Sequence, residues 1–338
     1  MKKIISLFIL SAVTLFPFFS EDTGITKINN EYEKITNSLM NNSVENSLAM
    51  TVTPDAYVGK LVKSIPPHFS SGFCLSGALY NTNPLQEGLQ TLYDEIKSSA
   101  QDIDSEIDLK ANIPETIIHP AASLKLRIGG IFLPFDFGGF FMATVPGGIN
   151  NIKLLQYDFS LDYLAFGFDI RYAILQGNLI LPQISVGAGY AFQKQTLAIG
   201  FSNNFLYTDT LDPSVTKTGK LTTSNSFSIQ TGTLYLSLQI SKQLGFIIPF
   251  LGFRASLYQY NNGYSWDYTL TDENDTKFEE NSKNGSGSQS RDFIFDNHYA
   301  QIFGGLTLTF PYFELALSAS WNIKTFNYSG SVSLSFKM

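Results

Sequence analysis

The sequence predicts an all-β protein, a transmembrane antiparallel up-and-down β-barrel of about ten strands with a short N-terminal helical extension. Three observations predict it. From residue 68 onward, segments of about ten residues alternate apolar with small or polar side chains, which is the pattern of membrane-spanning strands. Only 15% of the residues are charged, against about 25% in typical soluble domains. Beyond residue 20 no window is apolar for the roughly 20 residues of a helical span, which leaves a closed barrel.

Composition and charge narrow the classes of function. The 338 residues carry 22 basic and 29 acidic side chains, a formal net charge of −7 that argues against binding to nucleic acid. Aromatic residues make up 14%, too many for a disordered chain. One cysteine excludes an intramolecular disulfide, and one cysteine with three histidines leaves little for a transition metal. We therefore expect no nucleic-acid partner, no metal site and no cofactor.

The N-terminus predicts export. Residues 1–20 combine a basic start with an apolar run, as in a secretory signal peptide. Residues 21–67 are predicted to form a periplasmic extension, in which Thr53-Pro54-Asp55 is a helix start. The amphipathic helix that follows ends at a proline pair. This helix either plugs the lumen or lies on the periplasmic rim, and a mobile periplasmic extension is the alternative.

Residues 68–338 form the predicted barrel. In its last strand, Val332, Leu334 and Phe336 alternate with serines and a lysine. The polar face of these segments is mostly Ser, Thr, Gly, Gln and Asn, whereas a soluble sandwich would carry charge on its solvent face. The predicted strands are 68–80, 121–132, 136–144, 162–175, 179–193, 226–241, 245–258, 301–310, 313–323 and 326–337.

The connections agree with an even number of strands. In a bacterial single-chain barrel, short turns face the periplasm and long loops face the outside. Counting back from the C-terminus, the connections near Pro311, Lys242, Gln176 and Leu133 fall on the periplasmic side, and all are short. The long loops that fall outside are 81–120, 194–225 and 259–297.

One segment breaks the alternation. Within 153–175 the apolar residues shift from odd to even positions. Either a bulge lies near Tyr163, or 153–161 belongs to the loop. Two further strands in 194–225 are an alternative as well, so ten to fourteen strands stay open and ten is our prediction.

Two of the predicted loops carry further features. Residues 81–120 place Leu85, Leu89 and Leu92 at helical spacing, which predicts a short helix over the barrel mouth. Residues 271–292 are acidic and rich in Gly and Ser. Their spacing does not fit an EF-hand calcium loop, so we expect a solvated surface loop.

Six charged side chains fall on lumen-facing positions of the alternation. In a narrow barrel they must pair, because a lone buried charge is costly. They either form a salt-bridge cluster that holds a packed lumen or line a constriction that selects anions or acidic solutes. We favour the packed lumen, because barrels of about eight strands fill with side chains and those of about 16–18 leave an aqueous channel. The six are Lys125, Arg127, Asp169, Arg171, Arg254 and Glu314.

No catalytic site is predicted. A hydrolase would need Ser and His within hydrogen-bond reach, and no G-x-S-x-G elbow occurs in the sequence. His68, His119 and His298 lie near strand starts, where structural histidines are common. Cys74 is expected to be a small buried residue that faces the lumen. We therefore predict that the chain is not an enzyme.

Aromatic residues on lipid-facing positions are expected to form the girdles at the two membrane interfaces. The candidates lie toward the middles or ends of predicted strands. They are Tyr172, Tyr190, Trp321 and Tyr328.

With these features together, residues 68–338 resemble bacterial outer-membrane β-barrels. The run from Tyr328 to Phe336 resembles the C-terminal signal that the barrel-assembly machinery reads, although Lys337 and Met338 follow the aromatic residue here. The run 166–190 is similar to strand-turn-strand segments of uncharacterised barrels. This resemblance implies a Gram-negative source, location in the outer membrane, and contact with outer-membrane lipid and the assembly machinery.

A second resemblance is to the long-chain fatty-acid transporter family. That family has an N-terminal plug, aromatic-rich walls and helices in its extracellular loops, and this sequence has a helix before the barrel and a predicted loop helix. The family is longer, with fourteen strands, and its Asn-Pro-Ala plug motif is replaced by Asn83-Pro84-Leu85 as the nearest run. The resemblance therefore implies no binding residue.

We expect a monomeric outer-membrane barrel that acts as a channel or transporter for small or hydrophobic molecules. The alternative is a surface-exposed adhesin or structural barrel, which binds partners through its extracellular loops, chiefly 194–225 and 259–297.

Overall fold

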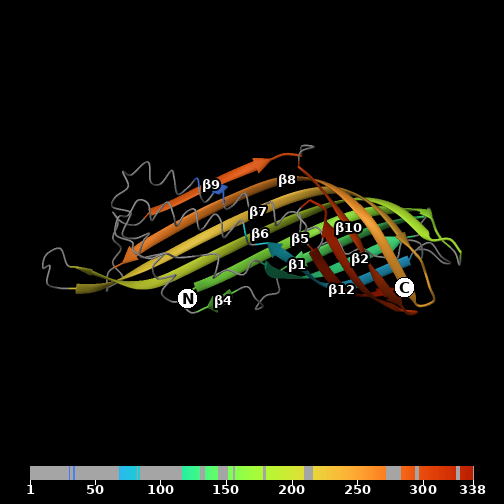
Figure 1. Ribbon diagram of the computed structural model, residues 1–338, viewed down its shortest axis with the longest axis horizontal. Helices are drawn as coiled ribbons and strands as arrows, with labels where there is room; N and C mark the ends of the chain where they lie inside the picture. Colours follow the sequence, from blue (N-terminus) through green and yellow to red (C-terminus); the bar gives the residue numbers. More distant parts are fainter. Residues whose placement is uncertain are drawn as a thin grey trace.

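The alternating segments fold into antiparallel β-strands that curve into a barrel wall in the computed structural model (Figure 1). The structure describes residues 30, 33–34, 68–81, 83, 116–129, 134–143, 151–154, 157–177, 180–208, 216–271, 283–293, 297–324 and 328–337. The strands in these residues are β1 (His68–Asn81), β2 (Thr116–Gly129), β3 (Phe135–Ala143), β4 (Asn151–Leu154), β5 (Tyr157–Leu175), β6 (Gln183–Thr208), β7 (Thr216–Ser241), β8 (Ile247–Thr271), β9 (Lys283–Arg291), β10 (His298–Thr309), β11 (Phe313–Asn322) and β12 (Tyr328–Lys337).

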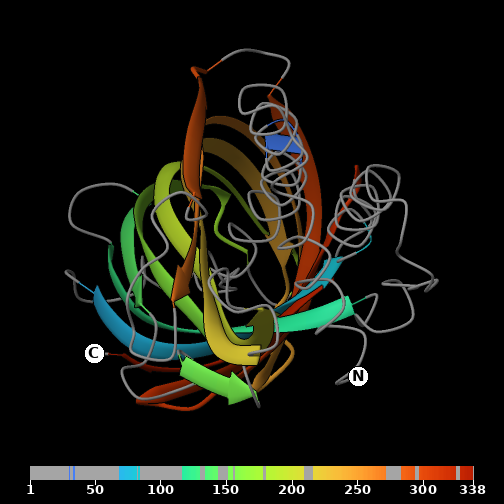
Figure 2. The ribbon, with the colours of Figure 1, turned by 90° about the vertical axis from the view of Figure 1, so that its left-hand side faces the viewer.

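Ten of these strands close the ring. Strands β1, β2, β3, β5, β6, β7 and β8 pair in this order, β8 pairs with β10, and β10, β11 and β12 lead back to β1. Among the described pairings, β4 pairs with β5 and β9 with β8, so both lie outside the ring. Figure 2 looks at one end of the ring and shows β9 standing above it. The prediction of a closed antiparallel barrel of ten strands is confirmed.

Three neighbouring strands are much longer than a membrane requires. Strands β6 and β7 have 26 residues each and β8 has 25, whereas β11 and β12 have 10. A membrane-spanning strand needs about 9–11 residues, so more than half of each long strand lies beyond the bilayer. Lys194, Gln230 and Asn261 pair in one row across β6, β7 and β8. The extension is defined as the parts of these three strands between this row and the long loops, together with β9. It runs to the left in Figure 1.

The extension corrects the predicted loops 194–225 and 259–297. Much of both stretches is strand, paired residue by residue between β6 and β7 and between β7 and β8. The described residues of 194–225 add no further strand to the ring, because they lengthen two of the predicted strands. Sequence reasoning missed this because Ser, Thr, Asn and Gly on a solvated strand face have the composition of a loop.

The break in alternation on β5 has a different cause from either predicted one. The pairing of β5 with β6 is regular from Tyr157 to Ala173, and the register shifts only between Ala173 and Leu175. No bulge therefore lies at Tyr163, and 157–161 is strand. Asp162 is exposed on the outward side, whereas Leu164 is the first of a run of exposed apolar outward residues. The switch in parity thus marks the point where the strand leaves the lipid.

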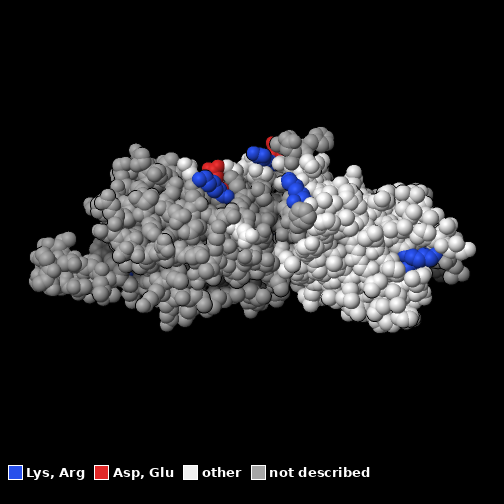
Figure 3. All heavy atoms as spheres, viewed as in Figure 1, with Lys and Arg blue, Asp and Glu red and all other residues white. Residues whose placement is uncertain are grey.

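An apolar band encircles the ring between that boundary and the short turns. On β5 it consists of the outward residues from Leu164 to Ile174, which is about 30 Å along the strand at roughly 3.3 Å per residue. Because strands tilt by about 35–45°, this length fits an apolar band about 25 Å tall. Figure 3 shows the matching surface at the right, where the described wall carries few charged side chains. The outward face therefore matches the hydrocarbon of a bilayer.

Several predicted features lie outside the described residues. These are the signal peptide 1–20, the helix start at 53–55 and most of 21–67, the predicted helix at Leu85, Leu89 and Leu92, and residues 272–282 of the acidic stretch. Residues 283–291 of that stretch form β9, so this part is strand and not loop. The loop predicted at 81–120 is wrong at its two ends, because Asn81 ends β1 and residues 116–120 begin β2. Among the described residues, no helix is both long and apolar enough to cross a membrane.

Candidate functional site

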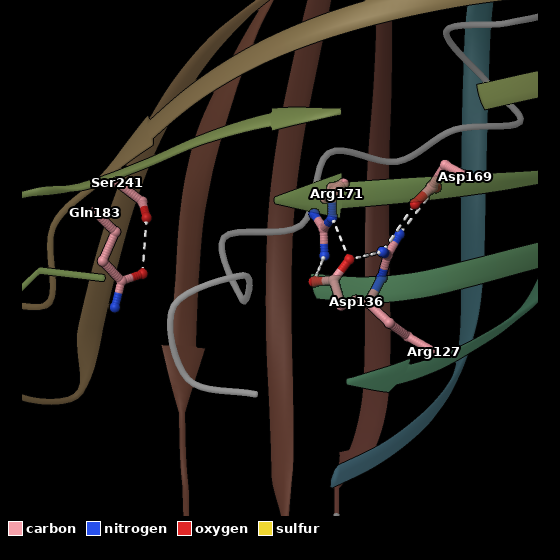
Figure 4. Close-up of polar contacts among 6 residues, drawn as sticks. All are labelled: Arg127, Asp136, Asp169, Arg171, Gln183 and Ser241. Atoms are coloured by element: carbon pink, nitrogen blue, oxygen red, sulfur yellow. Dashed lines mark hydrogen bonds and ion pairs between the residues drawn. The ribbon is translucent and has the colours of Figure 1, made fainter. Parts of the chain in front are cut away.

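Four charged side chains meet inside the barrel near its short-turn end (Figure 4). We call them the lumen cluster: Arg127 from β2, Asp136 from β3, and Asp169 and Arg171 from β5. The alternation that sends apolar neighbours outward sends these four inward. Two guanidinium groups and two carboxylates make the cluster neutral.

The contacts form a chain in which the charges alternate. Arg127 donates from Nη1 to Asp169 Oδ1 at 2.8 Å and from Nη2 to Oδ2 at 2.9 Å. Arg171 donates from Nε to Asp136 Oδ1 at 2.9 Å and from Nη2 to Oδ2 at 2.8 Å. Arg127 also bonds to Asp136, which links the two bidentate pairs. Asp136 is 1% exposed, so its charge depends on the two arginines rather than on water.

Strand register brings these residues together. Gly138 on β3 pairs with Arg127 on one side and with Asp169 on the other, so the three share one row. A Cβ added at Gly138 would lie 2.4 Å from Arg127 Nη2, which is inside van der Waals contact. The missing side chain lets the guanidinium of Arg127 cross β3 to reach Asp169.

Replacing Gly138 with alanine is therefore expected to displace Arg127 and destabilise the barrel by about 2–3 kcal/mol, the range for a buried charge-assisted hydrogen bond that is lost. Thermal unfolding, followed by the heat-modifiable migration of the barrel on gels, measures this. Gly139→Ala is the matched control, because its added Cβ would find its nearest neighbour at 3.6 Å, an ordinary contact. Equal losses in the two variants would contradict the role given to Gly138.

Arg254 comes from a more distant strand than the cluster residues, although its charge acts on Asp169. It is on β8, 3% exposed, and donates from Nη1 to Gln301 Oε1 at 3.3 Å. Its guanidinium carbon lies 5.1 Å from the ring centroid of Tyr235 and 5.2 Å from that of Phe303. A desolvated cation over aromatic faces gains about 2 kcal/mol or more, so ring faces contribute to holding this buried charge.

The last two predicted lumen charges, Glu314 and Lys125, are not members of the lumen cluster. Glu314 accepts a hydrogen bond from Nζ of Lys337 at 3.2 Å, at the short-turn end where β12 finishes. Lys337 therefore has a structural partner, although it departs from the assembly signal. Lys125 is half-buried on β2, two residues before Arg127 and on the same face. The six predicted charges thus fall into several sites along the lumen.

Asp136 is the member of the cluster that sequence reasoning missed. It lies at the start of β3, and the alternation places it on the same face as Phe140 and Met142, both buried. Its parity was therefore a usable signal. What the sequence lacked was the register, which sets Asp136 opposite Arg171.

A second lining covers the inner face of the extension. We call it the aromatic face: Phe227 from β7, and Tyr264 and Trp266 from β8, all 4–8% exposed. An added Cβ atom at Gly285 of β9 would lie 2.6 Å from the ring of Trp266, and one at Gly287 would lie 2.7 Å from the ring of Tyr264. The two rings therefore lie across the neighbouring strand, which glycine alone permits.

The outer face of the wall changes from apolar to polar at the membrane boundary. In the ring, apolar side chains face out, and the lumen cluster faces in together with buried aromatic residues such as Tyr235, Phe250 and Phe303. In the extension, Ser224, Ser265 and Asp267 are exposed on the outer face, while the aromatic face lies inside. A strand surrounded by water buries its apolar side, so the polar outer face follows from the change of solvent.

The predicted girdle residues lie at several levels. Tyr172 is near the short-turn end, with its ring 4.8 Å from that of Phe135. Trp321 and Tyr328 are paired at the opposite end of β11 and β12, and Tyr190 lies between, 5.9 Å from Phe168. Their role as girdles stays a prediction. Sequence reasoning missed exposed aromatics at the short turns, Phe246 and Tyr312.

The other candidates lie on strands of the ring. Cys74 is a free, buried cysteine on β1. His68 and His298 begin β1 and β10, and His119 lies in β2. Among the described residues, no group of three or more His, Cys, Asp or Glu is arranged to hold a metal ion.

A closed ring of antiparallel strands with an apolar outward band and an ion-paired interior defines the class of outer-membrane β-barrels. No protein-family model and no curated protein matches the sequence. Among solved structures, the chain is similar to the outer membrane protease OmpT from Escherichia coli, at 8% identity and a TM-score of 0.40, covering 82% of this chain and 100% of that one.

Two further similar structures have other roles. One is a FadL homologue from Pseudomonas aeruginosa, at 9% identity and a TM-score of 0.28, covering 88% of this chain and 97% of that one. The other is Ail, the attachment invasion locus protein of Yersinia pestis, at 7% identity and a TM-score of 0.21, covering 81% and 100%. Arguments about function therefore start from this chain's own residues.

Proposed function

We propose that the protein is an outer-membrane transporter for small hydrophobic molecules. The observation that carries the proposal is the aromatic face, which lies inside the wall just beyond the lipid boundary. Flat Tyr and Trp rings bind apolar molecules through their large surface while their polar tips stay satisfied. The neutral lumen cluster below them offers no net charge to attract ions.

The location and partners in this proposal follow from the outward apolar band. The barrel would lie in the outer membrane, in contact with its lipid, after insertion by the barrel-assembly machinery. The absence of enzymatic activity stays a prediction.

Fluorescence tests whether the aromatic face binds an apolar probe. The chain has two tryptophans, and Trp266 belongs to the aromatic face whereas Trp321 has the outward parity of Leu317 on β11. We expect saturable energy transfer to N-phenyl-1-naphthylamine in a Trp321→Phe variant, where Trp266 is the only donor. A Trp266→Phe variant keeps only the donor at the membrane and should show a non-saturating signal. Equal signals in the two variants would exclude the aromatic face as the binding surface.

Planar-bilayer conductance tests passage through the lumen. The mature chain is compared with and without residues 21–67, and heat-modifiable migration confirms that each form is folded. Steady conductance in both forms would establish an open pore, and conductance only after deletion would make residues 21–67 a plug. Silence in both forms together with no saturable probe binding would overturn the transport proposal.

A specific observation favours a second candidate function, binding of a surface partner. The extension projects beyond the lipid boundary with a polar outer face. Because β9 lies outside the ring, deletion of residues 272–293 should leave the barrel folded. Cells that display the deletion variant should then lose attachment to a partner surface, while a pure transporter would attach equally with and without this segment.

A further inference from the structure

A buried cation lies on the inner wall at mid-height of the ring. Arg254 is midway along β8 between Ile247, at the short turn, and Asn261, where the extension begins. It is 3% exposed, and its Nη1 donates to the neutral amide of Gln301. A full positive charge is therefore held inside the barrel, where its interaction with a ligand of opposite charge is stronger than in water.

Two aromatic rings fix the position of this guanidinium, those of Tyr235 on β7 and Phe303 on β10. A Cβ added at Gly189 of β6 would overlap the ring of Tyr235. A Cβ added at Gly252 of β8 would likewise overlap the ring of Phe303. Each ring therefore lies across a glycine of a neighbouring strand. Ring faces attract the charge but accept no strong hydrogen bond from its N–H groups.

Two buried hydroxyls beside Arg254 have no hydrogen-bond partner among the described residues. They are Oη of Tyr235 and Oγ of Ser256, on side chains that are 5% and 3% exposed. Tyr235 pairs directly with Ser256 between β7 and β8, and Ser256 is the next inward residue of β8 after Arg254. A buried hydroxyl without a partner is costly in the folded protein, so a ligand that accepts hydrogen bonds here would relieve that cost.

The chemistry of these three groups fits one carboxylate. A guanidinium above the face of a phenol ring lies about 6 Å from the phenol oxygen, and a carboxylate that accepts hydrogen bonds of about 2.8 Å from both sides spans this distance. A guanidinium has only donors, and hydroxyls donate strongly to a charged acceptor. A cation would be repelled by Arg254, and an apolar group would leave both hydroxyls without a partner.

The charge of the inner wall also favours an anion. Within the described part of the ring, the inward cations outnumber the inward carboxylates. The cations are Lys125, Arg127, Arg171, Arg254 and Lys337, and the carboxylates are Asp136, Asp169 and Glu314. The lumen as a whole is therefore positive, although the lumen cluster itself is neutral.

We propose that Arg254, Tyr235 and Ser256 form a carboxylate-binding site in the lumen, in which the guanidinium and the two hydroxyls hold the oxygens of one carboxylate. The ligand class is a small organic acid. The site is distinct from the aromatic face, because Tyr264 lies about 33 Å farther along β8 at roughly 3.3 Å per residue. It depends on the inner wall of the ring alone, so failure of the proposed transport of hydrophobic molecules would not decide it.

Calorimetric titration of the refolded full mature chain tests the site. Benzoate is the probe, and benzamide is its neutral counterpart with the same ring. We expect saturable binding of benzoate that is at least about tenfold tighter than that of benzamide, since only benzoate gains a charge-assisted hydrogen bond from Arg254. The two probes share their ring, so apolar contacts elsewhere in the barrel would not separate them. Equal affinities, or no saturable binding of benzoate, would overturn the proposal.

Two variants each remove one hydroxyl and keep the surrounding shape. Tyr235→Phe and Ser256→Ala should each weaken benzoate binding by about tenfold, the effect of one hydrogen bond to a charged group. Neither variant should lower the unfolding temperature, because neither hydroxyl has a hydrogen bond to lose within the described residues.

Thr307→Val is the matched control. It also removes a buried hydroxyl that has no hydrogen-bond partner in the described part of the chain, but near the short-turn end of β10. This variant should bind benzoate as the unaltered chain does. If Tyr235→Phe and Ser256→Ala also bound benzoate as tightly as the unaltered chain, the two hydroxyls would be purely structural and the proposal would be wrong.

Discussion

Replacing Asp136 with asparagine is expected to lower the free energy of unfolding by about 3–5 kcal/mol, the range for breaking a buried ion pair by removing one partner. The carboxylate is 1% exposed and accepts hydrogen bonds from both Arg171 and Arg127. Asparagine keeps the shape but leaves the cluster with two guanidinium groups and one carboxylate. Urea titration of the refolded barrel, followed by gel migration, measures the loss.

Two further variants separate charge from simple loss of a side chain. Asp267→Asn makes the same substitution on the exposed outer face of β8, where a change within about 0.5 kcal/mol is expected. Asp136→Asn combined with Arg171→Gln restores a neutral cluster, so it should lose less than Asp136→Asn alone. A double variant that is the less stable of the two would show that geometry, and not charge balance, holds the cluster.

The ring followed from the sequence because alternation alone assigns each side chain to lipid or lumen. That rule placed Arg127, Asp169 and Arg171 inside, and Asp136 obeys it too. The rule works within one strand and carries no information about the neighbour. Arg127 meets Asp169 across Gly138 because of two strand registers, that of β2 with β3 and that of β3 with β5. The cluster could therefore be predicted as a set of inward charges but not as a set of contacts.

The extension could not be predicted because its strands do not obey the rule for lipid. On β5 the change of parity near Asp162 reflects a change of solvent with an unbroken backbone. Strand β9, with the sequence KNGSGSQSR, has the composition of a flexible linker. It forms a strand beside β8 because its glycines leave room for the rings of Tyr264 and Trp266. Such a strand is specified by its neighbour rather than by its own side chains.

Removing the two positive charges of the lumen cluster and removing its two negative charges are expected to shift ion selectivity in opposite directions. Arg127→Ser with Arg171→Ser leaves the carboxylates of Asp136 and Asp169 unpaired, which should favour cations. Asp136→Asn with Asp169→Asn leaves the two guanidinium groups, which should favour anions. Two unit charges about 4 Å apart interact with about 4 kcal/mol at an effective dielectric constant near 20. We therefore expect the ratio of cation to anion permeability to change by about tenfold, which needs only part of this energy.

Reversal potentials in a salt gradient measure the selectivity, in whichever form of the chain conducts, with residues 21–67 present or deleted. The two double variants control for each other, because both remove two charges from the same four residues and differ only in the sign that remains. Opposite shifts would place the lumen cluster in the permeation path. Identical selectivity in the two variants would mean that ions pass elsewhere and that the cluster is purely structural. In that case the neutral cluster would serve stability alone, and the loss of stability expected for Asp136→Asn would measure its effect.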